Sequence, residues 1–95
     1  MDRDNGYDNV VSELRETYIK KNHDYGSSFS KSFAEFGIIS AVVRMSDKME
    51  RLKSLCHKDA AVAESIRDTV MDLANYAIMC AMELDKVSDN KKKQS

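Results

Sequence analysis

The apolar residues of this 95-residue chain recur at intervals of three and four positions, the spacing of one face of an α-helix. The first stripe predicts a helix over residues 5–21. Glycine, serine and aspartate then cluster over residues 23–29 and predict a loop, followed by a short helical turn over residues 30–36 that Gly37 ends. The apolar positions of the first helix are Tyr7, Val10, Val11, Leu14 and Tyr18.

A second helix is predicted from Gly37 or Ile38 to Cys56. Its apolar residues alternate in steps of four and three, which is typical of a narrow coiled-coil seam. Asp47 and Glu50 lie one turn apart on the other side of this helix. The residues of the seam are Ile38, Val42, Met45, Met49, Leu52 and Cys56.

The third and longest helix is predicted from about residue 60 to residue 86, after a polar break. The line opposite its core stripe begins with Glu64 and Asp68 but ends with Ile78 and Met82. A helix that is apolar on two sides is buried, either inside the domain or in an oligomer. Residues 88–95 are polar and basic, and we expect a disordered tail there. The predicted core stripe consists of Val62, Ile66, Val70, Leu73, Ala77, Cys80 and Leu84.

The sequence has no proline and three glycines, which favours helix over sheet. We therefore expect an all-α fold of three main helices plus a short helical turn, in a single domain over residues 1–87. A chain this short buries only a modest core, so we expect a homodimer or homotetramer that forms a four-helix or larger bundle.

Charge and hydropathy exclude several classes of protein. Fifteen Lys and Arg nearly balance 16 Asp and Glu, so no basic field would attract nucleic acid. No apolar run reaches the ~20 residues of a membrane span, and the N-terminus lacks a signal-peptide core. The two cysteines have no metal-binding or redox spacing. These features predict a cytoplasmic protein.

Carboxylates cluster along the first half of the third helix. Glu64, Asp68 and Asp72 follow one another at intervals of four residues, and Asn75 follows three residues later. Like charges at this spacing repel, and the repulsion grows when they are partly desolvated unless a cation lies between them. Oxygen ligands of this kind suit Mg²⁺. The alternative is a solvated acidic face paired with lysine and arginine.

Three segments carry a family resemblance: KNHDYGSSF over residues 21–29, RMSDKMERL over residues 44–52 and ESIRDTVMDLANYA over residues 64–77. Together they resemble the MazG-like superfamily of all-α nucleoside triphosphate pyrophosphohydrolases. Within it they are most similar to the nucleotide modification associated domain type 1 proteins of phages and bacteria. The superfamily has a glutamate at the position of Ser65, and in this chain Glu64 precedes that position by one residue.

The resemblance implies Mg²⁺-dependent binding of a nucleoside or deoxynucleoside triphosphate, or of a modified nucleotide, and its hydrolysis to the monophosphate and pyrophosphate. It implies a cytoplasmic location in a bacterium or a phage-infected host. The displaced glutamate leaves open an inactive nucleotide-binding or sequestering protein of phage origin, and a purely structural protein is a third possibility. The implied Mg²⁺ ligands are Asp47, Glu50, Glu64 and Asp68, with Glu50 as the catalytic base. The implied nucleotide-binding residues are Lys21, Tyr25, Arg44, Lys48, Arg51, Asp72 and Asn75.

Overall fold

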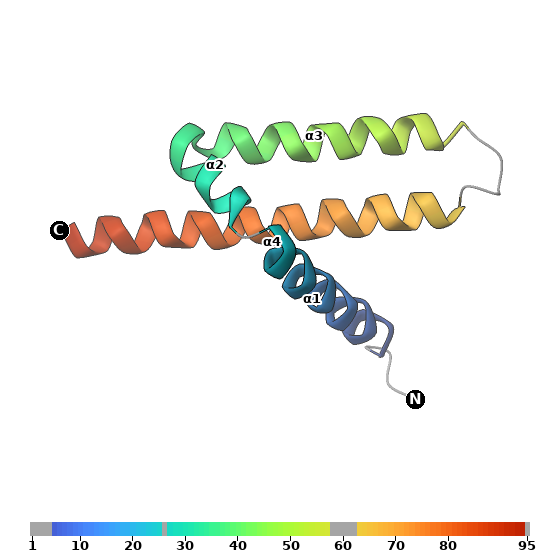
Figure 1. Cartoon of the computed structure of the whole chain (residues 1–95), viewed down its shortest axis with the longest axis horizontal. Coiled ribbons are helices and arrows are strands. Elements are labelled where there is room, and N and C mark those ends of the chain that lie inside the picture. The colour runs from blue at the N-terminus through green and yellow to red at the C-terminus, as the bar shows by residue number, and fades with distance from the viewer. Residues whose placement is uncertain (1–4, 26, 58–62, 95) are drawn as a thin grey trace.

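The computed structural model describes residues 5–25, 27–57 and 63–94, and in these ranges all regular secondary structure is helical. The predicted all-α fold is therefore confirmed. The long helices α3 and α4 form an antiparallel hairpin, α2 packs at one end of it, and α1 crosses α4 on one side (Figure 1). The four helices are α1 (Asn5–Tyr25), α2 (Ser28–Phe36), α3 (Ile38–Leu55) and α4 (Ala63–Gln94).

Two predicted boundaries differ from the structure. We expected a loop over residues 23–29, but α1 continues to Tyr25 and α2 begins at Ser28. We also expected residues 88–95 to be disordered, whereas α4 extends to Gln94. Neither glycine nor proline follows residue 86, so nothing in the sequence stops that helix. The predicted start of the last helix, near residue 60, lies outside the described residues.

Gly37 separates α2 from α3, as the sequence predicts. Its backbone φ angle of 76° lies in a region that residues with a Cβ atom rarely adopt. Its backbone N–H donates to the carbonyl of Phe33 at 2.7 Å, which closes the end of α2. This sharp junction turns the chain so that α2 packs at the end of the α3–α4 hairpin.

The buried core lies where α2, α3 and α4 meet. Phe29 and Phe33 from α2 pack against Ala41 of α3, which is fully buried, and Cys80 of α4. The Phe29 ring stacks on that of Tyr76, with ring centroids 6.0 Å apart. Short α2 therefore supplies the aromatic side chains that fix the spacing of the two long helices.

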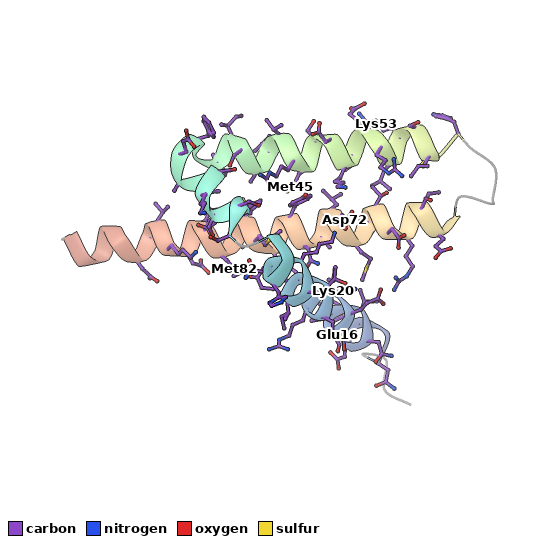
Figure 2. The ribbon with its side chains drawn as sticks, in the orientation of Figure 1. Glu16, Lys20, Met45, Lys53, Asp72 and Met82 are labelled. Atoms are coloured by element: carbon purple, nitrogen blue, oxygen red, sulfur yellow. The ribbon has the colours of Figure 1, made fainter. Side chains whose placement is uncertain are left out.

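The predicted apolar stripes of the two long helices are only partly turned toward this core. On α3, the side chains toward α4 include Ala41 and Leu55, whereas Ile38 and Val42 of the predicted seam are 50% and 44% exposed. Figure 2 shows Met45 on the side of α3 toward α4 and Lys53 on the side away from it. On α4, Cys80 is buried, but Val70 and Leu84 are 46% and 44% exposed. Met45 of the α3 seam and Cys80 of the α4 stripe do pack in the core, so the described residues cover each stripe only in part. On α1, Leu14 is the buried member of the predicted stripe.

Enlarging Ala41 is expected to destabilise the fold. Because Ala41 is 0% exposed among aromatic and sulfur-containing side chains, Ala41→Leu should overpack the core and lower the free energy of unfolding by about 1–3 kcal/mol. Urea denaturation would measure the change. The control is Ala34→Leu, at an exposed position of α2, which should leave stability nearly unchanged. Equal effects of the two substitutions would contradict this description of the core.

Candidate functional site

A cleft of about 150 Å³ lies between the four helices, on the side of the hairpin where α1 packs. Its lining combines an aromatic and apolar wall with a polar wall that carries both signs of charge. The lining residues are Tyr18, Lys21, Asn22, Ser28, Phe29, Arg44, Asp72, Asn75, Tyr76 and Met79.

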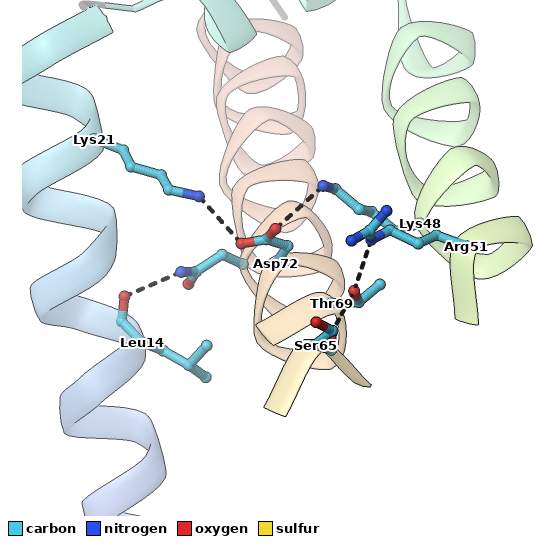
Figure 3. A network of polar contacts seen from close by, with 8 residues as sticks. Leu14, Lys21, Lys48, Arg51, Ser65, Thr69 and Asp72 are labelled. Carbon is cyan, nitrogen blue, oxygen red and sulfur yellow. Dashed lines mark hydrogen bonds and ion pairs between the residues drawn. The ribbon is translucent and has the colours of Figure 1, made fainter. Parts of the chain in front are cut away.

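Asp72 joins three helices at the polar wall. Nζ of Lys21, from α1, donates to Oδ1 of Asp72 at 3.1 Å, and Nζ of Lys48, from α3, donates to Oδ2 at 3.1 Å (Figure 3). All three residues are in the predicted nucleotide-binding set. The structure therefore brings together residues that are 24 and 51 positions apart in the sequence.

The two lysines change the protonation of Asp72. Partial burial of this carboxyl would by itself raise its pKa, but hydrogen bonds from Lys21 and Lys48, together with their charges, lower the pKa below its ordinary value. Asp72 is therefore a stable carboxylate at neutral pH. The three groups together carry one net positive charge beside the cleft.

Asn75 ties α1 to α4 from within the cleft. It is 8% exposed, and its Nδ2 donates to the carbonyl of Leu14 at 3.1 Å. Arg51 is engaged one turn further along the hairpin, where its Nε donates to Oγ1 of Thr69 at 3.3 Å. That hydroxyl donates in turn to the carbonyl of Ser65 at 2.8 Å. Both predicted ligand-binding residues thus make contacts that hold helices together.

Arg44 lies against the aromatic wall. Its guanidinium carbon is 5.5 Å from the centroid of the Phe29 ring, within range of a cation–π interaction. Its NH2 group donates to Oγ of Ser32 at 3.2 Å. A positive charge and an aromatic surface therefore lie side by side in the cleft, close to the two lysines.

A smaller hollow continues from the cleft toward Glu83, which is 8% exposed. Lys86 donates to its carboxylate at 2.8 Å and Ser30 donates at 2.6 Å. These hydrogen bonds outweigh the effect of burial and lower the pKa of Glu83. Glu83 is not among the predicted site residues, because an acid three residues before a lysine is typical of an exposed helix surface.

The four predicted Mg²⁺ ligands are all exposed: Asp47, Glu50, Glu64 and Asp68. Glu50 forms an ion pair with Lys53 at 3.1 Å and does not line the cleft. In the described part of the chain, no three acidic, histidine or cysteine side chains are close enough to hold a metal ion. The described residues of a single chain therefore do not bring the four predicted ligands together around one metal ion. The Mg²⁺ site and the catalytic role of Glu50 stay predictions.

The cleft contains only part of the predicted nucleotide-binding set. Lys21, Arg44, Asp72 and Asn75 line it, and Lys48 joins it through Asp72. The side chain of Tyr25 lies outside the described residues. The aromatic wall was missed, although Phe29 ends the segment KNHDYGSSF and Tyr76 follows Asn75 directly. The lining residues absent from the prediction are Tyr18, Asn22, Ser28, Phe29, Tyr76 and Met79.

Replacing Asp72 should destabilise the protein in a pH-dependent way. Asp72→Asn removes the carboxylate shared by two lysines, so the free energy of unfolding at pH 7 should fall by roughly 1 kcal/mol. Because folding lowers the pKa of Asp72 from 3.8, its stabilisation is present above that value and is lost as the pH falls through the lower folded-state pKa.

The difference in urea-induced unfolding between wild type and Asp72→Asn should therefore shrink as the pH falls below about 4. Asp85→Asn, at an exposed position of the same helix, is the control and should resemble wild type throughout. A difference that persists or grows in acid would refute the role given to the two ion pairs.

Comparison with known proteins gives one match. The family model described as nucleotide modification associated domain 1 matches residues 21–84, more than half of the chain. That segment contains every residue lining the cleft except Tyr18. Neither the curated proteins nor the solved structures provide a match.

Proposed function

We propose that this chain, which belongs to the nucleotide modification associated domain 1 family, binds a nucleotide in the cleft between α1 and the α3–α4 hairpin. One observation carries the proposal. Two lysines, held on a single carboxylate, lie beside an arginine that itself covers an aromatic ring. A nucleotide offers the matching groups, an anionic phosphate and a flat base.

The charges favour an anionic ligand. Lys21, Lys48 and Arg44 contribute three positive charges, and Asp72 cancels one of them. A phosphate oxygen accepts strong charge-assisted hydrogen bonds from such groups. The Lys21 side chain is 56% exposed and that of Lys48 is 28% exposed. Lys21 is thus the freer of the two to move from Asp72 to an incoming phosphate, while Lys48 keeps the carboxylate paired.

The aromatic wall favours a base or another planar group. Stacking of a base on an aromatic side chain contributes about 1–3 kcal/mol and tolerates different bases. The rings of Phe29 and Tyr76 are already aligned, with 22° between their planes. At about 150 Å³ the cleft is smaller than the roughly 300 Å³ at which small-molecule sites begin, so part of the nucleotide would lie outside it.

Hydrolysis to the monophosphate and pyrophosphate is the second candidate. Its support is the spacing of Asp47 and Glu50 on α3 and the position of Asp68 on α4, which resemble the acidic pairs of pyrophosphohydrolases. These acids are exposed and do not form one cluster in the single chain. The cleft itself therefore favours binding over hydrolysis.

Removing the charge of Lys21 is expected to weaken nucleotide binding. Lys21→Met should raise the Kd at least tenfold, because one charge-assisted hydrogen bond contributes about 1.5–3 kcal/mol. Lys20→Met is the matched control, since it makes the same change at an adjacent exposed residue that does not line the cleft. Isothermal titration calorimetry with deoxynucleoside mono- and triphosphates would measure both variants.

Binding of none of these nucleotides would refute the proposal. So would equal losses in Lys21→Met and Lys20→Met, because binding would then depend on overall charge alone. Circular dichroism of both variants would establish that each remains folded.

Binding should not require Mg²⁺, because the cations of the cleft are themselves able to hold a phosphate. A nucleotide at 100 times its Kd should stabilise the protein by about 2.7 kcal/mol and so raise the Tm by roughly 10–20 °C, with or without Mg²⁺. If the nucleotide raised the Tm only when Mg²⁺ was also present, this expectation would be contradicted. Pyrophosphate release that Asp68→Ala abolishes, and that Asp85→Ala leaves unchanged, would instead establish the hydrolase.

A further inference from the structure

The carboxylate of Glu83 has one oxygen that the fold leaves unused. The residue is 8% exposed, and Ser30 and Lys86 both donate to the same oxygen, Oε2, at 2.6 and 2.8 Å. The other oxygen, Oε1, accepts no hydrogen bond from the described residues. Among those residues, no fully buried side-chain oxygen or nitrogen lacks a partner. Oε1 therefore still reaches open space, and the open space that Glu83 lines is the smaller hollow.

This oxygen is suited to a ligand group that donates a hydrogen bond. Hydrogen bonds from Lys86 and Ser30, together with the charge of Lys86, lower the pKa of Glu83 below its ordinary value. The group is thus a carboxylate at neutral pH, and a carboxylate oxygen accepts hydrogen bonds but donates none. An acceptor that is largely shielded from water is costly to leave without a donor. A ligand that fills the hollow should therefore bring an N–H or O–H group.

The hollow continues the proposed nucleotide cleft. The two spaces share four lining residues, among them Asn22 of α1 and Phe29 of the aromatic wall. Ser30, which donates to Glu83, follows Phe29 directly on α2. The hollow has a volume of about 50 Å³. Because whole small-molecule sites begin at roughly 300 Å³, this space would admit one substituent of a ligand rather than the ligand itself.

Asp72 and Glu83 lie at the two ends of one line on α4. Tyr76 and Met79 lie between them, and steps of four, three and four residues place all four side chains on the same face of the helix. At about 1.5 Å per residue, Glu83 lies roughly 16 Å beyond Asp72 along the helix axis. The line thus runs from the paired lysines, past the aromatic wall, to a hydrogen-bond acceptor. A nucleotide has its groups in the same order: phosphates, a base that stacks, and the polar edge of that base.

We infer that the free oxygen of Glu83 selects nucleotides whose base carries an exocyclic amino group, such as cytosine or adenine, over bases with an oxo group in its place. This inference rests on the proposed function. An amino group projects from the ring, so it can enter the hollow and donate to Oε1. An oxo group would instead bring a second acceptor against the carboxylate, and the ring N–H beside it is recessed. Glutamate accepts a hydrogen bond from the amino group of cytosine in the same way in protein–DNA contacts.

The triphosphates dCTP and dUTP provide a matched test, because their bases have the same size and differ in an amino group against an oxo group. Isothermal titration calorimetry would measure both, without Mg²⁺ so that no metal-dependent turnover occurs. Wild type should bind dCTP at least tenfold more tightly than dUTP, because one hydrogen bond to a charged group accounts for a difference of that size.

Glu83→Gln should abolish or reverse this preference. Ser30 and Lys86 donate to the Oε2 position, so the carboxamide oxygen should occupy it and direct the amide NH₂ group toward the base. Such a donor would favour the oxo group of dUTP. The matched control is Glu35→Gln, at an exposed residue of α2 that lines neither space, and it should keep the wild-type preference.

The outcomes separate this inference from the proposed function. Equal Kd values of wild type for dCTP and dUTP, or tighter binding of dUTP, would overturn the inference and leave the proposed function intact. A preference for dCTP that Glu83→Gln retains would also overturn it, because another residue would then read the base. Binding of neither nucleotide would overturn both.

A purine pair keeps the inference testable if Glu83→Gln does not fold. The nucleotides dATP and dITP differ by the same replacement of an amino group by an oxo group, so wild type should bind dATP at least tenfold more tightly. Binding of dITP as tight as that of dATP would contradict the role given to Glu83.

Discussion

The arrangement around the cleft depends on the carboxylate of Asp72, which accepts hydrogen bonds from two lysines on different helices. Apolar packing explains the position of α2, whose phenylalanines lie in the core. Apolar packing explains the position of α1 far less, because Leu14 is the one buried apolar residue among the described residues of that helix. The crossing of α1 over α4 depends instead on polar contacts from Asp72 and Asn75, which are both partly or fully shielded from water.

The third polar contact between α1 and α4 illustrates the difference that burial makes. Arg67 donates two hydrogen bonds to Glu13, at 2.8 and 2.9 Å. Hydrogen bonding lowers the pKa of Glu13 and raises that of Arg67. Both side chains are about half exposed, so solvent screens this pair and it contributes little to stability. Asp72 therefore has the larger influence on how α1 closes the cleft.

Periodicity predicted the helices and the break at Gly37, but it did not predict which neighbour each face meets. The four-and-three spacing of α3 indicates a narrow apolar seam of the coiled-coil type, but it does not say which helix that seam contacts. In the single chain, the line toward α4 includes Lys48, a polar residue that becomes half-buried because it is paired with Asp72. Such a pairing joins residues 24 positions apart and leaves no local signal in the sequence. The sequence did predict that Asp72 and Asn75 belong to one site, because both residues are on one helix and lie about one turn apart.

The position of Ser65 connects the family resemblance with the proposed binding function. A shift of one residue rotates a helical side chain by about 100°, so Glu64 points in a different direction from a side chain at position 65. Ser65 is half-buried in the line of α4 that continues through Thr69, toward α3 and Arg51, whereas Glu64 is exposed. A carboxylate at position 65 would lie near Arg51. In this chain the hydroxyl of Thr69 accepts a hydrogen bond from Arg51 instead. In this chain the partner of Arg51 is therefore a neutral hydroxyl, so this contact does not cancel the positive charge of the guanidinium.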